Sequence, residues 1–158
     1  MISIRNYEVS DTGALWSIFY NTVRMVNIQD YSLAQVQAWA SDSIDPAIWQ
    51  SMLIQNAPFV ALMNNTIVGY ADLQQDGLID HFFVHHAFQK QGVGNALMQH
   101  IIDAANERDL VSLHANVSKT AKPFFERFGF VVIKEQTVEL RNELFTNFLM
   151  QNSQLTKT

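Results

Sequence analysis

The sequence predicts an α+β fold in which a mixed, mainly antiparallel central sheet carries helices on both faces. The first third of the chain repeats apolar residues at three-and-four spacing, which is typical of helices that bury one face. From residue 58 onward, most segments instead read as short strands separated by polar turns. The 158 residues are 48% hydrophobic and 16% charged, so the chain can bury an ordinary core. We therefore expect one domain over residues 1–150 and a polar tail over residues 151–158.

The first elements are a short strand and a helix. Ile2 and Ile4 alternate with polar residues as a strand does, and Ser10 or Asp11 then offers an N-cap. The helix that follows is expected to run to about Val26. Its buried face is predicted to hold Leu15, Ile18, Phe19, Thr22 and Met25.

Two further helices begin at recognisable signals. Ser32 and Gln35 have the spacing of a capping box, in which each side chain bonds the other residue's backbone N–H group. In the dipeptide Asp45-Pro46, an N-cap residue precedes a proline at the first helical position. We expect these helices to form a flap over one face of the sheet.

The strands follow in order along the rest of the chain. Strands over 59–63, 67–73 and 78–84, joined by turns at Asn64-Asn65 and Asp76-Gly77, predict an antiparallel meander. A helix from Gln91 to about Arg108, a strand over 111–115 and a helix over 121–128 come next. The last strands are predicted over 130–133, 137–140 and 144–150. The strand over 144–150 is expected at a sheet edge, which either pairs with a second copy as a homodimer or stays capped.

Composition excludes several functions. The chain has no cysteine, which rules out disulfides, a thiol nucleophile and a thiolate metal site. Its formal net charge of −5 argues against a nucleic-acid partner, because such binding rests on clustered Lys and Arg. No apolar core of a signal peptide follows Met1, and no apolar run approaches a membrane span, so we expect a cytoplasmic protein without a membrane partner.

The most informative stretch is FFVHHAFQKQGVGNAL over residues 82–97, a strand followed by a glycine-bearing helix start. Helix N-termini leave backbone N–H groups unpartnered and carry partial positive charge, so they hold anions. The predicted anion cradle is the N–H series of Gln91, Gly92, Val93, Gly94 and Asn95. A Rossmann loop would need a further glycine where Leu97 stands, and the Gly-Lys-Ser/Thr of a Walker loop is absent.

What remains resembles the acetyl-CoA loop of the GNAT superfamily of N-acetyltransferases. Gln89, Gly92 and Gly94 match its Gln/Arg-x-x-Gly-x-Gly/Ala pattern after a strand that ends at Val84. The segment AKPFFERFGF over residues 121–130 is similar to the superfamily's Ala-x-x-Phe-Tyr-Glu-Lys-x-Gly-Phe block. The resemblance implies the GNAT fold, in which the sheet splays between its fourth and fifth strands and admits the pantetheine arm. It also implies direct transfer of the acetyl group of acetyl-CoA to a primary amine of a small molecule or protein, without a metal.

The resemblance implies a set of cofactor contacts. The backbone of Phe83 and Val84 is expected to pair with pantetheine and to hold the thioester oxygen. Lys90 reads either as a contact for the 3′-phosphate or as a solvated lysine. Two positions depart from the pattern: Ser118 stands where an Asn is common, and Phe125 stands where a Tyr would protonate the leaving thiolate.

The catalytic assignments stay open at the sequence level. The missing proton comes from Tyr31, Tyr70 or water, or the thiolate leaves unassisted because a thiol pKa is only about 8.5. Asp80 is expected on the same strand face as Val84, either steering the ammonium and relaying its proton or making a turn hydrogen bond. His81 is expected on the opposite face unless a bulge intervenes.

Two groups of residues have competing interpretations. His81, His85 and His86 invite a metal site, but ordinary surface histidines are favoured. Tyr31, Trp39 and Trp49 either line an acceptor pocket or pack in the core. The acceptor is not identifiable from the sequence. The alternative function is an acetyl-CoA-binding sensor or partner-binding module without catalysis, which Phe125 motivates.

Overall fold

The computed structural model describes residues 1–155 and contains two four-stranded sheets. The first sheet has the order β1-β2-β3-β5 and is antiparallel throughout. Its strands are β1 (Ile2–Asn6), β2 (Phe59–Met63), β3 (Thr66–Ala71) and β5 (Phe82–Val84). The second sheet has the order β4-β6-β8-β7. Its strands are β4 (Leu78–Ile79), β6 (Leu113–Ser118), β8 (Glu143–Asn152) and β7 (Val131–Leu140).

Five α-helices in the described residues complete the α+β fold. They are α1 (Thr12–Met25), α2 (Leu33–Trp39), α3 (Pro46–Asn56), α4 (Val93–Glu107) and α5 (Lys122–Arg127). Short 3-10 turns lie at Val9–Asp11, Asn27–Gln29 and His86–Phe88. Within residues 1–155, no helix is both long and apolar enough to cross a membrane.

The two sheets part at residues 80 and 81. β4 runs parallel to β6, with Ile79 opposite Ala115, whereas β5 pairs antiparallel with β3. The predicted splay between the fourth and fifth strands is therefore confirmed, but the predicted continuous strand over 78–84 is interrupted. The cause is Asp72, whose buried carboxylate accepts the backbone N–H groups of Asp80 and His81 at 2.7 and 3.0 Å.

Two of the predicted helix starts are confirmed by their hydrogen bonds. Ser32 Oγ accepts from the backbone N–H of Gln35 at 3.1 Å, and the side chain of Gln35 accepts from the N–H of Ser32 at 2.7 Å. Asp45 accepts from the N–H of Ala47 at 2.8 Å, with Pro46 as the first helical residue. These bonds fix the residues at which α2 and α3 begin.

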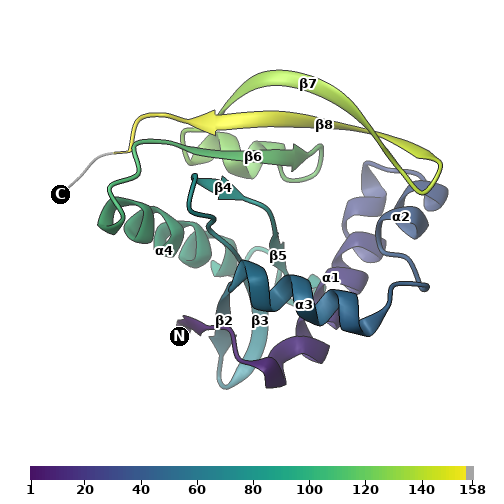
Figure 1. Cartoon of the computed structure of the whole chain (residues 1–158), viewed down its shortest axis with the longest axis horizontal. Coiled ribbons are helices and arrows are strands. Elements are labelled where there is room, and N and C mark those ends of the chain that lie inside the picture. The colour runs from purple at the N-terminus through teal and green to yellow at the C-terminus, as the bar shows by residue number, and fades with distance from the viewer. Residues whose placement is uncertain (156–158) are drawn as a thin grey trace.

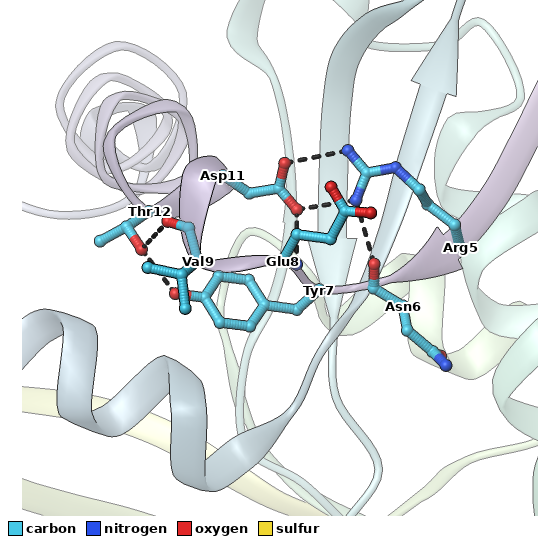
Figure 2. Close-up of polar contacts among 7 residues, drawn as sticks. All are labelled: Arg5, Asn6, Tyr7, Glu8, Val9, Asp11 and Thr12. Atoms are coloured by element: carbon cyan, nitrogen blue, oxygen red, sulfur yellow. Dashed lines mark hydrogen bonds and ion pairs between the residues drawn. The ribbon is translucent and has the colours of Figure 1, made fainter.

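The predicted cap at the start of α1 is different. Asp11 occupies the N-cap position, but its side chain caps no N–H group of α1. Figure 2 shows the carboxylate turned toward Arg5, with which it forms bonds of 2.7 and 2.9 Å, and it also accepts the N–H of Glu8 at 2.9 Å. Asp11 therefore joins the end of β1 to the start of α1.

The first sheet has helices on both faces. One buried cluster joins α1, α2 and α3 to the sheet through residues such as Leu15, Leu53 and Tyr70. A second cluster places Leu97 and Ile101 of α4 against the other side. Met25, predicted to be buried, is the last residue of α1 and is 60% exposed.

The β7–β8 hairpin arches over the molecule and reaches the region of α2 (Figure 1). β7 is one strand where two were predicted, with a register shift between Val132 and Lys134. β8 lies between β6 and β7, so the prediction that residues 144–150 form the edge was wrong. β8 includes Gln151 and Asn152 of the predicted tail, and residues 156–158 lie outside the described residues.

Candidate functional site

A cavity of about 890 Å³ opens where the two sheets part. One end is formed by the loop before α4 together with β6 and α5, and the other end by α1, α2 and the β7–β8 hairpin. The interrupted strand between them contributes Asp80, His81, Phe82, Phe83 and Val84. The cavity therefore brings the glycine loop and the predicted catalytic strand into one site.

The glycine loop leaves the first turn of α4 uncapped. Lys90 and Gly92 have left-handed backbone conformations, with φ of 60° and 87°, and no side chain caps the helix at Gly92. A Cβ atom at Gly94 would lie 3.1 Å from the Phe124 ring, so a larger residue would displace that ring. Lys90, Gly92, Gly94 and Asn95 line the cavity. An uncapped N-terminus beside a cationic side chain suits an anionic group such as the phosphates of CoA.

The other two members of the predicted cradle have different positions. Val93 is 1% exposed and its side chain packs in the core, so only its main chain is available to a ligand. Gln91 is exposed and is not part of the cavity lining. Position 92 favours glycine because of its φ of 87° and not because of crowding. A Cβ atom there would approach only Ile2, at 3.8 Å.

Gln89 holds the turn between β5 and α4. Its Nε2 donates to the carbonyl of Val84 at 2.7 Å, and Thr22 Oγ1 donates to the same carbonyl at 2.9 Å. Both acceptor positions of this carbonyl are therefore used within the protein, which fixes the end of β5 against α1.

The free edge of β5 is set by its pairing with β3. The N–H of Asp72 donates to His81 and the N–H of His85 donates to Val68, and Phe83 lies midway between them opposite Tyr70. Antiparallel pairs alternate, so the main chain of Phe83 is directed at β3 and that of Val84 at the cavity. This differs from the sequence-based expectation, in which the backbone of both residues pairs with pantetheine and holds the thioester oxygen.

Asp80 and His81 lie together beside α3. Asp80 Oδ2 accepts from Asn56 Nδ2 at 3.1 Å and lies 4.0 Å from His81 Nε2. The His81 ring packs against Trp49, with ring centroids 6.0 Å apart, whereas Phe82 packs against the α5 side. The expectation that Asp80 shares a face with Phe82 and Val84 was wrong, because the interruption resets the alternation.

Burial shifts the pKa of three groups around this interruption. The pKa of His81 is lowered by its burial, so the ring is neutral at neutral pH. Its Nδ1 lies 3.0 Å from the hydroxyl of Tyr70, whose own pKa burial raises well above 10. Burial raises the pKa of Asp72 to about 6, although two backbone N–H groups favour its charged form.

Tyr31 lines the cavity, and its hydroxyl group both donates and accepts a hydrogen bond. The hydroxyl donates to the carbonyl of Thr146 at 2.8 Å and accepts the N–H of Lys119 at 3.0 Å. Burial raises the pKa of Tyr31. Trp39 also lines the cavity, whereas Trp49 does not: it is buried and donates to the carbonyl of Thr12.

Ser118 and Phe125 line the cavity at the α5 end. Ser118 Oγ accepts from the N–H of Ala121 at 3.1 Å, at the entry to α5. Phe125 is 3% exposed and packs edge-on against Phe130, with ring centroids 5.0 Å apart. Within the described residues, no group of three His, Asp or Glu side chains is placed to hold a metal ion.

Sequence reasoning missed three residues. Asp72 determines the interruption but does not line the cavity, Arg127 of α5 lines it, and Asn147 of β8 lines it with an amide oxygen that has no partner among the described residues. A single acidic residue within the otherwise apolar predicted strand over 67–73 was the available signal for Asp72. Arg127 stands at the Lys position of the GNAT block that residues 121–130 resemble, which was the available signal for it, whereas Asn147 carried no signal beyond its residue type.

The comparisons with known proteins identify the family of the chain. Residues 27–150 match the acetyltransferase (GNAT) domain family. The chain is 39% identical over 150 residues to the uncharacterized N-acetyltransferase YafP of Escherichia coli K12, covering 95% of both chains. A GCN5-related N-acetyltransferase structure from Rhodopseudomonas palustris is 28% identical with a TM-score of 0.91, over 96% of this chain and 94% of that one.

A more distant structure shows a bound cofactor. The yncA protein of Salmonella typhimurium, solved with its cofactor acetyl-CoA, is 19% identical with a TM-score of 0.72, over 99% of this chain and 95% of that one. That likeness supports the fold alone. The family match and the relative from Escherichia coli show that the chain belongs to the GNAT family of N-acetyltransferases, which are acyltransferases that use acetyl-CoA.

Proposed function

We propose that the protein transfers the acetyl group of acetyl-CoA directly to a primary amine of a small molecule or protein. Acetyl-CoA supplies the acetyl group in activated form, as a thioester. The observation that carries the proposal is the cavity that joins the uncapped start of α4, the open edge of β5 and Asp80. A cysteine relay is excluded because the chain has no cysteine.

The α4 end of the cavity is proposed to bind CoA. The N–H groups at the start of α4 hold phosphate, and Lys90 and Arg127 add positive charge. The N–H of Val84 lies on the open edge of β5, where it stabilises negative charge on the thioester oxygen. Gln89 and Thr22 support this arrangement by fixing the carbonyl of Val84.

Asp80 is proposed to bind the acceptor amine. Its carboxylate attracts the ammonium and accepts a proton from it, directly or through water. His81, neutral and 4.0 Å away, is held by Tyr70 and forms the adjoining wall. We assign no acid role to Tyr31, because its proton is engaged with the carbonyl of Thr146 and a thiol of pKa about 8.5 departs without one.

The proposal is tested by titrating the protein calorimetrically with acetyl-CoA, CoA and ATP, and then by measuring thiol release with a panel of primary amines. We expect acetyl-CoA and CoA to bind with micromolar affinity and ATP not to bind. At least one amine should raise the rate of thiol release. Tight CoA binding without thiol release above buffer hydrolysis would overturn the transfer and favour an acetyl-CoA sensor. Absence of CoA binding would overturn the site.

A further inference from the structure

We propose that the acceptor is a primary amine carried on an aromatic body, which binds against Trp39 and Phe83. The inference rests on the proposed function, since it names the substrate class for the same cavity. It is supported by the aromatic rings at the end of the cavity formed by α1, α2 and the β7–β8 hairpin, which we call the acceptor end. The charges around these rings and one amide without a hydrogen-bond partner also support it.

The acceptor end is a continuous set of rings centred on Trp39, which we call the aromatic wall: Tyr31, Trp39, Phe83 and Phe145. Trp39 is the last residue of α2 and is half-buried. The other three rings stand edge-on to it, with centroids 5.6, 6.4 and 6.2 Å away for Tyr31, Phe83 and Phe145. Edge-on and offset contacts are the favoured arrangements of aromatic rings, so a ligand ring that packs on Trp39 would gain a contact of the same kind.

The aromatic wall meets the reacting end at Phe83. Its ring centroid lies 6.4 Å from that of Trp39 and 5.7 Å from that of His81. Val84, with its N–H on the open edge of β5, is the next residue. An aromatic body that packs on Trp39 and Phe83 therefore places its amine beside Asp80 and His81.

The charges of the cavity suit a ligand with one ammonium group. Among the described residues that line the cavity, Asp80 is the only one with a carboxylate side chain. The cations Lys90 and Arg127 belong to the loop before α4 and to α5, at the CoA end. A polyamine would bring several positive charges to one carboxylate, and the ammonium group of Lys119, which lies 5.2 Å from the centroid of the Tyr31 ring, would repel a second charge at the aromatic wall.

The β7–β8 hairpin covers the aromatic wall. Val138 and Leu140 of β7 line the same cavity and add apolar surface. Asn147 lies two residues after Phe145 on β8, so the two side chains share a strand face. The Asn147 amide oxygen is buried and lacks a partner among residues 1–155, so a ligand with a hydrogen-bond donor on its body would satisfy it.

The test compares 2-phenylethylamine with ethylamine, which shares the aminoethyl group and lacks the ring. Calorimetric titrations of both amines use the full chain, with saturating CoA and without it. We expect 2-phenylethylamine to bind at least about tenfold more tightly than ethylamine, a preference that Trp39→Ala abolishes and Trp39→Phe retains. The control is Trp16→Ala, because Trp16 is another half-buried tryptophan, packed on Trp49 outside the cavity. We expect it to leave the preference unchanged.

Equal affinities of the two amines, or tighter binding of spermidine or of an alanine-terminated peptide, would overturn the inference. A preference that survives Trp39→Ala in a folded variant would also overturn it. These outcomes are separate from those of the proposed function. Failure of CoA to bind, or of acetyl transfer to occur, contradicts the enzymatic proposal, whereas the amine titrations report on the aromatic wall in either case.

Discussion

The carboxylate of Asp72 accepts the backbone N–H group of His81 at 3.0 Å, while the N–H of Asp72 donates to the carbonyl of His81 at 3.1 Å. The same carboxylate oxygen also accepts the N–H of Asp80 at 2.7 Å. The Asp72 side chain thus accepts hydrogen bonds that the backbone of a neighbouring strand would otherwise accept. β5 begins at the next residue, Phe82. A residue outside the cavity therefore determines which side chains enter it.

Asp72 gives a first prediction, on stability against pH. Burial raises its pKa from 3.8 to about 6, so between these values the folded chain keeps a proton that the unfolded chain has released. The unfolding free energy therefore falls as pH rises through this window, by on the order of 3 kcal/mol. Asp72→Asn keeps an acceptor oxygen and has no proton to lose. We expect urea unfolding between about pH 4 and pH 7 to show this fall in the wild type and not in the variant.

The comparison is made on the difference between the two stability profiles, because other carboxylates contribute equally to both. If the unfolding free energies of the wild type and Asp72→Asn changed with pH in parallel, the raised pKa of Asp72 would be contradicted. A variant that loses cooperative unfolding at every pH would instead mean that the charge itself is needed to hold the two N–H groups.

Asp80 gives the second prediction, on rate. Asp80→Asn removes the carboxylate that attracts the ammonium and takes its proton, so kcat should fall at least about tenfold. The affinity for acetyl-CoA should be unchanged, since Asp80 lies away from the glycine loop. The matched control is Asp76→Asn, because Asp76 is an exposed turn residue outside the cavity. Equal loss of acetyl-CoA affinity and rate in Asp80→Asn would show a structural role.

Gly94 gives the third prediction, on cofactor binding. Gly94→Glu brings a carboxylate to the start of α4 and pushes its Cβ toward the Phe124 ring, 3.1 Å away. We expect the Kd for CoA to rise at least about tenfold, because the helix terminus then faces negative charge on the protein itself. Gly13→Glu is the control, since a Cβ at Gly13 meets nothing within 4 Å. Unchanged affinity in folded Gly94→Glu would show that the phosphates bind elsewhere.

Features that depend on local sequence were predictable. The capping box at Ser32 and the Asp45-Pro46 helix start each follow from residues that are neighbours in the chain. The family resemblance then added the splay, which no local pattern contains.

Features that depend on long-range contacts were not predictable. The interruption at Asp80 depends on a carboxylate eight residues earlier in the chain that the fold brings beneath it, so strand alternation gave the wrong face. The order of β7 and β8 depends on which strand pairs with β6, and hydrophobic pattern alone does not specify that choice. The aromatic wall joins α2, β5 and β8, which lie far apart in the sequence.

Arg5 and Asp11 give the last prediction, on stability. Arg5 donates two bonds to a carboxylate that is 4% exposed, and this pairing lowers the pKa of Asp11 (Figure 2). Arg5→Ala leaves that carboxylate short of partners, so the unfolding free energy at neutral pH should fall by about 1–3 kcal/mol.

The sign against pH follows from the lowered pKa. The contribution of the pair is present above the unfolded pKa of Asp11, 3.8, and is lost as pH falls through the lower folded value. The gap between the wild type and Arg5→Ala in urea unfolding should therefore narrow below about pH 4. Arg5→Lys keeps the charge but loses the two-pronged geometry, so it should lie between them. A gap that stays constant down to acidic pH would mean that Arg5 stabilises the chain by packing rather than through Asp11.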